Sequence, residues 1–105
     1  MTARLTRWDG PAPGRATIEA RFRDEGLSPH GWCNGPGDRY GAHAHRYHKV
    51  LYCVSGGIVF HTADGDVELW PGDRLDVEPD TEHSATVGPT GVACLEASRH
   101  DEVTQ

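Results

Sequence analysis

The sequence has little positive charge and no long apolar run. Its 105 residues include 16 Asp and Glu but only 10 Lys and Arg, which gives a net charge of −6 with neutral histidines. An acidic chain repels the phosphate backbone of nucleic acids, so we expect no nucleic-acid partner. No stretch approaches the roughly 20 apolar residues that cross a bilayer, so we expect no membrane partner either.

We also expect no secretory signal, and the cysteines do not form a paired set. The first residues, MTARLTRWDG, contain no apolar segment. The three cysteines, Cys33, Cys53 and Cys94, have no paired spacing, and the last two lie inside apolar runs. These features predict reduced cysteines in a cytoplasmic protein rather than a disulfide framework in a secreted one.

What is present has the composition of one small globular domain. Hydrophobic residues make up 36 % of the chain and charged residues 25 %, a balance typical of folded proteins. A chain this short buries only a modest core, so association would add stability. We therefore expect a homodimer.

The N-terminal part predicts one helix between two irregular stretches. The sequence GPAPG at residues 10–14 ends an arm that cannot stay regular for long. The following RATIEARFRDEG predicts a short helix, because Ile18 and Phe22 share one face and Gly26 is a suitable C-cap. Residues 28–41 are rich in glycine and proline, and we expect them to form a loop.

From about residue 42 the pattern changes to short strands. Runs rich in Val, Leu, Ile and aromatic residues alternate with turn signals such as the Asp-Gly of ADGD. The runs are HKVLYCV, GIVFHT, VELW, RLDVE, HSATV and VACLEA. Six strands separated in this way predict an all-β sandwich or barrel.

Histidines crowd the start of the first run. On one continuous strand, His43 and His45 project to the same face as Lys49, whereas His48 projects to the other face. Two imidazoles on one face of a strand can bind the same metal ion. The opposite face, with Val50, Tyr52 and Val54 as an apolar stripe, needs cover from the helix, a second sheet or a second subunit.

The spacing of this region resembles a known motif, G-x5-H-x-H-x3-E-x6-G. Gly37, His43, His45 and Gly56 occupy their places, and Lys49 occupies the place of the glutamate. The chain is therefore similar to the cupins, small β-barrels of the jelly-roll or double-stranded β-helix type.

A second cupin motif, G-x5-P-x-G-x2-H-x3-N, is matched in part. Gly72 and His83 stand at the required separation of eleven residues. Pro79 comes one residue late, Asp80 replaces the glycine, and Val87 replaces the asparagine. The resemblance implies an all-β jelly-roll barrel over residues 35–98. It would follow an N-terminal arm and short helix at 1–34 and precede a C-terminal tail at 99–105.

By this resemblance, His43, His45 and His83 would bind one divalent metal ion: zinc, iron, nickel, copper or manganese. The usual glutamate ligand is absent, and the ammonium of Lys49 has no lone pair and repels a cation. Three neutral imidazoles can nevertheless hold a metal and leave positions open for water or substrate. Some cupin thiol and diketone dioxygenases are built on three histidines.

The roles of several nearby residues remain open from sequence alone. Lys49 is either a fixed positive charge beside the pocket or a lysine at the barrel rim whose ammonium reaches water. Tyr47 could present its hydroxyl to a ligand or serve in packing. His48, His61 and Glu96 are further residues that could contribute to the site, and Glu96 could instead pair with Lys49.

Two functions fit this pattern. The first is a metal-dependent enzyme of the oxygenase or isomerase kind, with Lys49 and Tyr47 as catalytic candidates. A dication on three neutral imidazoles, with Lys49 nearby, favours a small anionic substrate such as a carboxylate or enolate. The alternative is a non-catalytic cupin module that binds or senses a small ligand, which the missing glutamate and the incomplete second motif favour.

Overall fold

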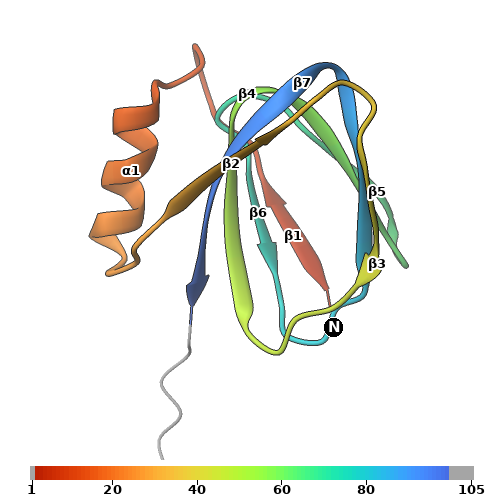
Figure 1. Ribbon diagram of the computed structural model, residues 1–105. Coiled ribbons are helices and arrows are strands. Elements are labelled where there is room, and N and C mark those ends of the chain that lie inside the picture. Colours follow the sequence, from red (N-terminus) through yellow and green to blue (C-terminus); the bar gives the residue numbers. More distant parts are fainter. Residues whose placement is uncertain (1, 100–105) are drawn as a thin grey trace, which may run out of the picture.

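Seven strands and one helix make up residues 2–99, the part of the chain that the computed structural model describes (Figure 1). In chain order they are β1 (Ala3–Thr6), α1 (Arg15–Asp24), β2 (His30–Asn34), β3 (Arg39–His43), β4 (His48–Thr62), β5 (Gly65–Leu69), β6 (Arg74–Val77) and β7 (His83–Arg99). Within these residues, no helix is both long and apolar enough to cross a lipid bilayer.

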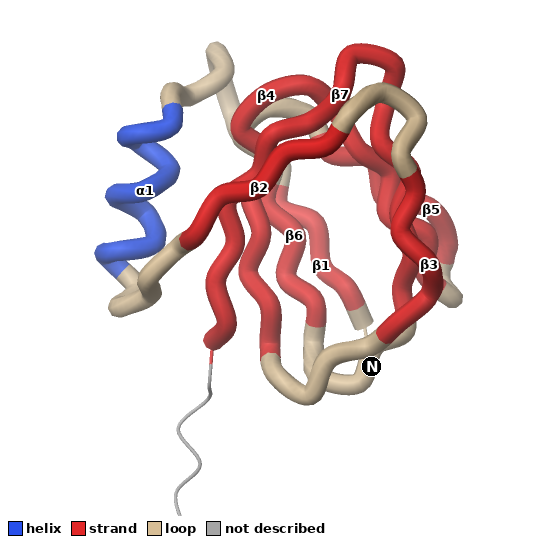
Figure 2. The backbone as a smooth tube through the Cα atoms, viewed as in Figure 1, coloured by secondary structure: helices blue, strands red, loops and turns tan. Residues whose placement is uncertain are grey.

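The two long strands, β4 and β7, organise the barrel. They run antiparallel from the pair His48 and Arg99 to the pair Thr62 and His83, and the register shifts midway. The first half of β4 and the last half of β7 lie in a sheet of order β1-β6-β4-β7-β2. Their other halves carry β5 and β3 at the opposite side (Figure 2). This arrangement confirms the predicted all-β jelly-roll barrel with a short N-terminal helix.

Glycines allow β4 and β7 to bend without breaking. Gly56 has a φ of 75°, and a Cβ built on it would lie 2.0 Å from the carbonyl oxygen of Gly91 on β7. Only glycine fits such a close approach of two backbones. The prediction of six separate strands from the turn signals was therefore wrong in number. HKVLYCV and GIVFHT both belong to β4, and HSATV and VACLEA both belong to β7.

The predicted helix is confirmed. Ile18 and Phe22 are buried on one face of α1, and the helix ends with Gly26 in a left-handed conformation at φ 73°. Phe22 packs edge-on against Tyr52 with ring centroids 5.2 Å apart. The helix thus covers the Val50 and Tyr52 face of the barrel, and both residues are buried within their own chain. That face needs no second subunit for cover, and the homodimer remains a prediction.

The expected loop at residues 28–41 was wrong, because it contains β2 and most of β3. Both strands lie on β7, with Trp32 opposite Cys94 and Tyr40 opposite Ala85. Their sequences lack strand periodicity, and the backbone groups of the central β7 strand supply the pairing instead. The arm also contributes β1, which pairs with β6. Of the expected tail at 99–105, residues 100–105 lie outside the described part of the chain.

The barrel interior and the space under α1 form two apolar cores. Both are closed by residues of β4 and β7. Cys53 and Cys94 face each other across these two strands as buried free thiols, while Cys33 is exposed and free. A thiol–thiol hydrogen bond and burial together raise the pKa of Cys94 far above its ordinary value. These two cysteines therefore act as small apolar core residues.

Candidate metal centre and adjoining pocket

Three histidine side chains meet at one end of the barrel. His43 is the last residue of β3, His45 lies in the following loop, and His83 is the first residue of β7. One ring nitrogen from each lies within 4.8 Å of the others. The ring centroids of His43 and His83 are 4.4 Å apart, and those of His43 and His45 are 4.8 Å apart. The structure thus brings together the three residues that the sequence motif picked out.

Strand pairing and a tethered loop create this convergence. His43 and His83 are direct partners across β3 and β7, so both rings project to the same side. The expectation that His43 and His45 share one strand was wrong, because residues 44–47 form a loop. The backbone N–H of Asp80 donates to the carbonyl of His45 at 2.6 Å and holds that loop. Asp80, in the motif's glycine place, adopts the left-handed φ of 63° that glycine favours and aspartate tolerates.

Backbone carbonyls orient two of the rings. The Nδ1–H of His43 donates to the carbonyl of Gly41 at 2.7 Å, and that of His83 donates to the carbonyl of Thr81 at 2.9 Å. A carbonyl only accepts, so each Nδ1 carries the proton and each Nε2 keeps its lone pair. This is the tautomer in which Nε2 can bind a metal ion.

The ring nitrogens aimed at the centre lack protein partners. Among residues 2–99, the Nε2 atoms of His45 and His83 are buried without any hydrogen bond. Buried polar atoms without partners are rare and mark either a strained site or a missing ligand. Burial, reinforced by the charge of Lys49, lowers the pKa of both His45 and His83, which favours the neutral rings that a metal requires. The donor set therefore fits a divalent metal ion.

Lys49 lies beside this cluster and points into the barrel. It is only 8 % exposed, so most of its stem is covered, and its role as a fixed charge beside the pocket remains a prediction. Its Nζ lies 3.4 Å from Oε1 of Glu96 on β7. The same oxygen accepts a hydrogen bond of 2.8 Å from the indole N–H of Trp32. Glu96 is outside the histidine cluster and is instead the partner of Lys49.

A pocket of about 310 Å³ adjoins the histidines. Its lining residues are Trp32, Tyr40, His43, Lys49, Phe60, Ala85 and Glu96. The rings of Trp32 and Tyr40 meet edge-on at 5.6 Å. Sequence analysis missed Trp32, because it lies in the segment predicted as loop and no local pattern directs its side chain toward Glu96. The pocket combines an apolar wall with one ion pair, which is typical of small-molecule sites.

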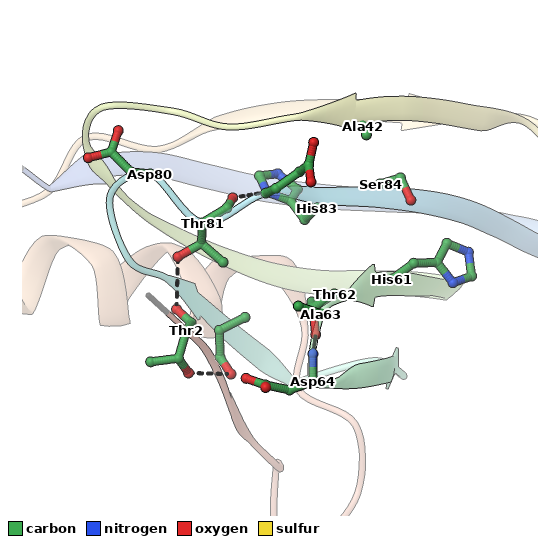
Figure 3. A pocket seen from close by; sticks show the side chains of 12 residues that line it. Thr2, Ala42, His61, Thr62, Ala63, Asp64, Asp80, Thr81, His83 and Ser84 are labelled. Atoms are coloured by element: carbon green, nitrogen blue, oxygen red, sulfur yellow. Dashed lines mark hydrogen bonds between the residues drawn. The ribbon is translucent and has the colours of Figure 1, made fainter.

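A second hollow of about 370 Å³ lies at the barrel mouth and is shown in Figure 3. It extends between Thr2, the Asp80–Thr81 loop and the turn at Ala63 and Asp64, with His83 at one side. His61 also borders it, but both of its ring nitrogens are engaged. They lie 2.8 Å from an oxygen of Asp66 and 2.9 Å from the hydroxyl of Thr86. His61 is not part of the histidine cluster.

The remaining candidates lie on either side of the centre. His48 turns away from it, as strand alternation predicts, and its Nε2 lies 2.8 Å from an oxygen of buried Asp76. The ring of Tyr47 stacks on His45 with centroids 4.9 Å apart. Tyr47 therefore supports the position of a histidine in the cluster, and a catalytic role for its hydroxyl remains a prediction.

Comparison with known families agrees with this geometry. Residues 33–95 match the AraC-like ligand binding domain. The chain belongs to this family. The matched segment runs from β2 to β7 and includes the three clustered histidines together with Lys49.

Individual relatives place the domain among the cupins. Over 52 residues the chain is 42 % identical to quercetin 2,3-dioxygenase of Bacillus subtilis strain 168. The aligned segment covers 48 % of this chain and 15 % of that protein. The chain thus spans less than a sixth of this relative's length. An RmlC-like cupin from Shewanella frigidimarina is 28 % identical with a TM-score of 0.61, covering 72 % of this chain and 68 % of that one.

A more distant structure shows the fold alone. A cupin superfamily protein from Desulfitobacterium hafniense superposes with a TM-score of 0.64 at 13 % identity, covering 95 % of this chain and 79 % of that one. Together with the family match, these structures show that the chain is a small cupin.

Proposed function

We propose that His43, His45 and His83 hold one divalent metal ion and that the protein is a metal-dependent enzyme acting on a small anionic molecule. The observation that carries this proposal is the pair of buried Nε2 atoms, on His45 and His83, that no group in residues 2–99 satisfies. Imidazole donors suit zinc, iron, nickel and copper, and manganese is a further candidate. A metal bound there would supply Lewis acidity toward an oxygen of the ligand.

Other residues of the chain would orient the histidine rings, attract the ligand and form the wall of the pocket. The carbonyls of Gly41 and Thr81 hold two rings in the ligating tautomer. Lys49 adds a fixed positive charge beside the centre and so favours a negatively charged ligand. The aromatic side chains give the pocket an apolar wall, which would strengthen charge interactions with a ligand bound against it.

The oxygenase or isomerase kind is supported by similarity rather than by geometry. The segment shared with quercetin 2,3-dioxygenase supports an oxygenase, and the open side of a three-histidine centre supports either reaction. A non-catalytic ligand-binding module is the second candidate, and the family description favours it. Prolonged incubation of the metal-loaded protein with any ligand that it binds separates the two. An enzyme converts the ligand, and a module returns it unchanged.

Metal analysis tests the core of the proposal. We expect one divalent ion per chain after purification without chelator, or after titration of the stripped protein. His45→Ala should abolish uptake, because it removes a donor from a loop without disturbing a strand. His61→Ala is the matched control, since its ring is engaged by Asp66 and Thr86 outside the cluster. A stripped protein that takes up none of the five metals would refute the proposal.

A further inference from the structure

The ion pair between Lys49 and Glu96 lies in the pocket itself, and they are the only formally charged side chains among its described lining residues. We propose that this pair selects the ligand: Lys49 binds one anionic oxygen of a flat, ring-bearing molecule, and Glu96 restricts that molecule to a single negative charge. The inference rests on the proposed function for the pocket's role. It names the chemical class of ligand and a specificity-determining residue.

The state of the Lys49 ammonium carries the first step. The side chain of Lys49 is only 10 % exposed, and its Nζ lies 3.4 Å from Oε1 of Glu96. This distance of 3.4 Å is longer than the roughly 2.7–3.2 Å of an N–H···O hydrogen bond. An ammonium has three donors, and one weak contact with Glu96 leaves donors that face the pocket. Donors left over in a pocket point to an acceptor oxygen on the ligand.

The position of Glu96 carries the second step. Its Oε1 is held by the indole N–H of Trp32 at 2.8 Å, so the carboxylate stays next to the pocket. Its charge balances that of Lys49, and a ligand with one anionic oxygen can add its own contact to the ammonium. A second negative charge on the ligand would lie close to the carboxylate and be repelled by it. Glu96 therefore discriminates against dianions.

The shape of the walls carries the third step. Trp32, Tyr40 and Phe60 supply three aromatic side chains to a pocket at the small end of the range for ligand sites. Aromatic walls favour flat apolar rings over hydroxyl-covered sugars, whose polar groups would be left unpaired against them. A benzoate-like molecule combines a flat ring with one anionic group and is a suitable probe.

Calorimetric titrations with four probes near pH 7.5 test the proposal: benzoate, benzyl alcohol, phthalate and monomethyl phthalate. In the unaltered chain we expect benzoate to bind roughly tenfold or more tightly than the neutral alcohol. We expect phthalate to bind roughly tenfold more weakly than its monomethyl ester, which has nearly the same shape but one charge fewer.

Variants assign these preferences to the two residues. Lys49→Met should remove the preference for benzoate over benzyl alcohol. Glu96→Gln should reduce the disadvantage of phthalate to within about threefold. Because Lys49→Met leaves a carboxylate without its partner, the double variant Lys49→Met/Glu96→Gln repeats the test in a charge-balanced pocket. Exposed Arg39 and Glu68 supply matched controls, and Arg39→Met and Glu68→Gln should keep the original preferences.

Each outcome decides the matter. A benzoate preference that survives both Lys49 variants, or a phthalate disadvantage unchanged in Glu96→Gln, would overturn the inference, as would absence of binding by all four probes at millimolar concentration. The charge preferences are measured on the stripped protein, because a dication beside the pocket would itself attract a dianion, and metal uptake is measured separately. Charge selection without metal uptake would refute the metal centre alone, and metal uptake without charge selection would refute the ligand class alone.

Discussion

His48 and Lys49 are neighbours in the chain, but they face two very different polar clusters on opposite sides of β4. The outer cluster is closed: buried Asp76 lies 2.8 Å from His48 and 2.8 Å from Nε of Arg74. Arg74 also pairs with Glu25, just after α1. In the inner cluster, by contrast, the Nε2 atoms of His45 and His83 have no partner among residues 2–99.

The difference teaches how to separate structural from functional polar groups in this barrel. Every charged group of the outer cluster finds its counterpart within the chain, so the cluster joins α1 to the sheet. In the inner cluster, burial removes two ring nitrogens from water, and no hydrogen bond within the described chain offsets this loss. Such uncompensated burial is expected where a ligand completes the site. Satisfaction of hydrogen bonds, rather than residue type, distinguishes the two.

The largest effect on stability is expected when the outer cluster is broken. Asp76→Asn keeps the shape of the side chain but leaves Arg74 and His48 facing a neutral amide in a buried place. We expect the free energy of unfolding to fall by about 3 kcal/mol, as when one partner of a buried ion pair is removed. Urea denaturation measures this loss. Asp66→Asn, at an exposed hydrogen bond with His61, is the control and should change stability by less than about 1 kcal/mol.

A somewhat smaller effect on stability is expected when metal is added, and it tests whether a metal ion completes the inner cluster. Adding the metal at about 100 times its dissociation constant should stabilise the unaltered protein by about 2.7 kcal/mol, seen as a higher melting temperature. His43→Ala should lose this response with little cost to the metal-free fold, because His43 is exposed. Asp76→Asn should start from a lower melting temperature but keep the rise. If both variants lost the response equally, the two clusters would not be independent.

The smallest effect on stability is expected when the pH is lowered. Burial raises the pKa of Asp76, but hydrogen bonds from Arg74 and His48 outweigh it, so the pKa is lowered overall. The hydrogen bond with Arg74 is the largest cause that lowers the pKa of Glu25. Groups with lowered folded-state pKa stabilise the protein above their unfolded pKa, and this stability is lost as pH falls through the folded value.

We therefore expect the free energy of unfolding to decline as pH drops below about 4, the range where unfolded Asp and Glu titrate. Unfolding curves between pH 7 and pH 3 would measure the decline. The slope should be shallower in Asp76→Asn, which cannot titrate at that position. An identical slope in the variant would show that the acid sensitivity arises elsewhere in the chain.

Much of the fold and part of the site followed from local sequence. The spacing of Ile18 and Phe22 predicted α1, and the turn signal at Gly72 was expected to end a strand. The glycines at 56 and 57 were also expected to end a strand, but β4 bends there and continues. Gly56 and Gly72 have positive φ, and a Cβ on Gly72 would lie 2.6 Å from Trp8. The helix depends on a few consecutive residues, so the sequence pattern predicts it directly. The close approaches at Gly56 and Gly72 are instead to Gly91 and Trp8, which are distant in the sequence.

Tertiary structure decided which distant side chains became neighbours. The partner of Lys49 is Glu96, and the wall residue Trp32 comes from a segment without strand periodicity. His45 reached the cluster from a loop rather than from a strand. These placements depend on the register between β4, β7 and β2, which is set by packing and backbone pairing across the whole barrel. The sequence by itself determined the helix and the three histidines, whereas only the tertiary structure decided the bends of β4 and β7 and the pocket beside the histidines.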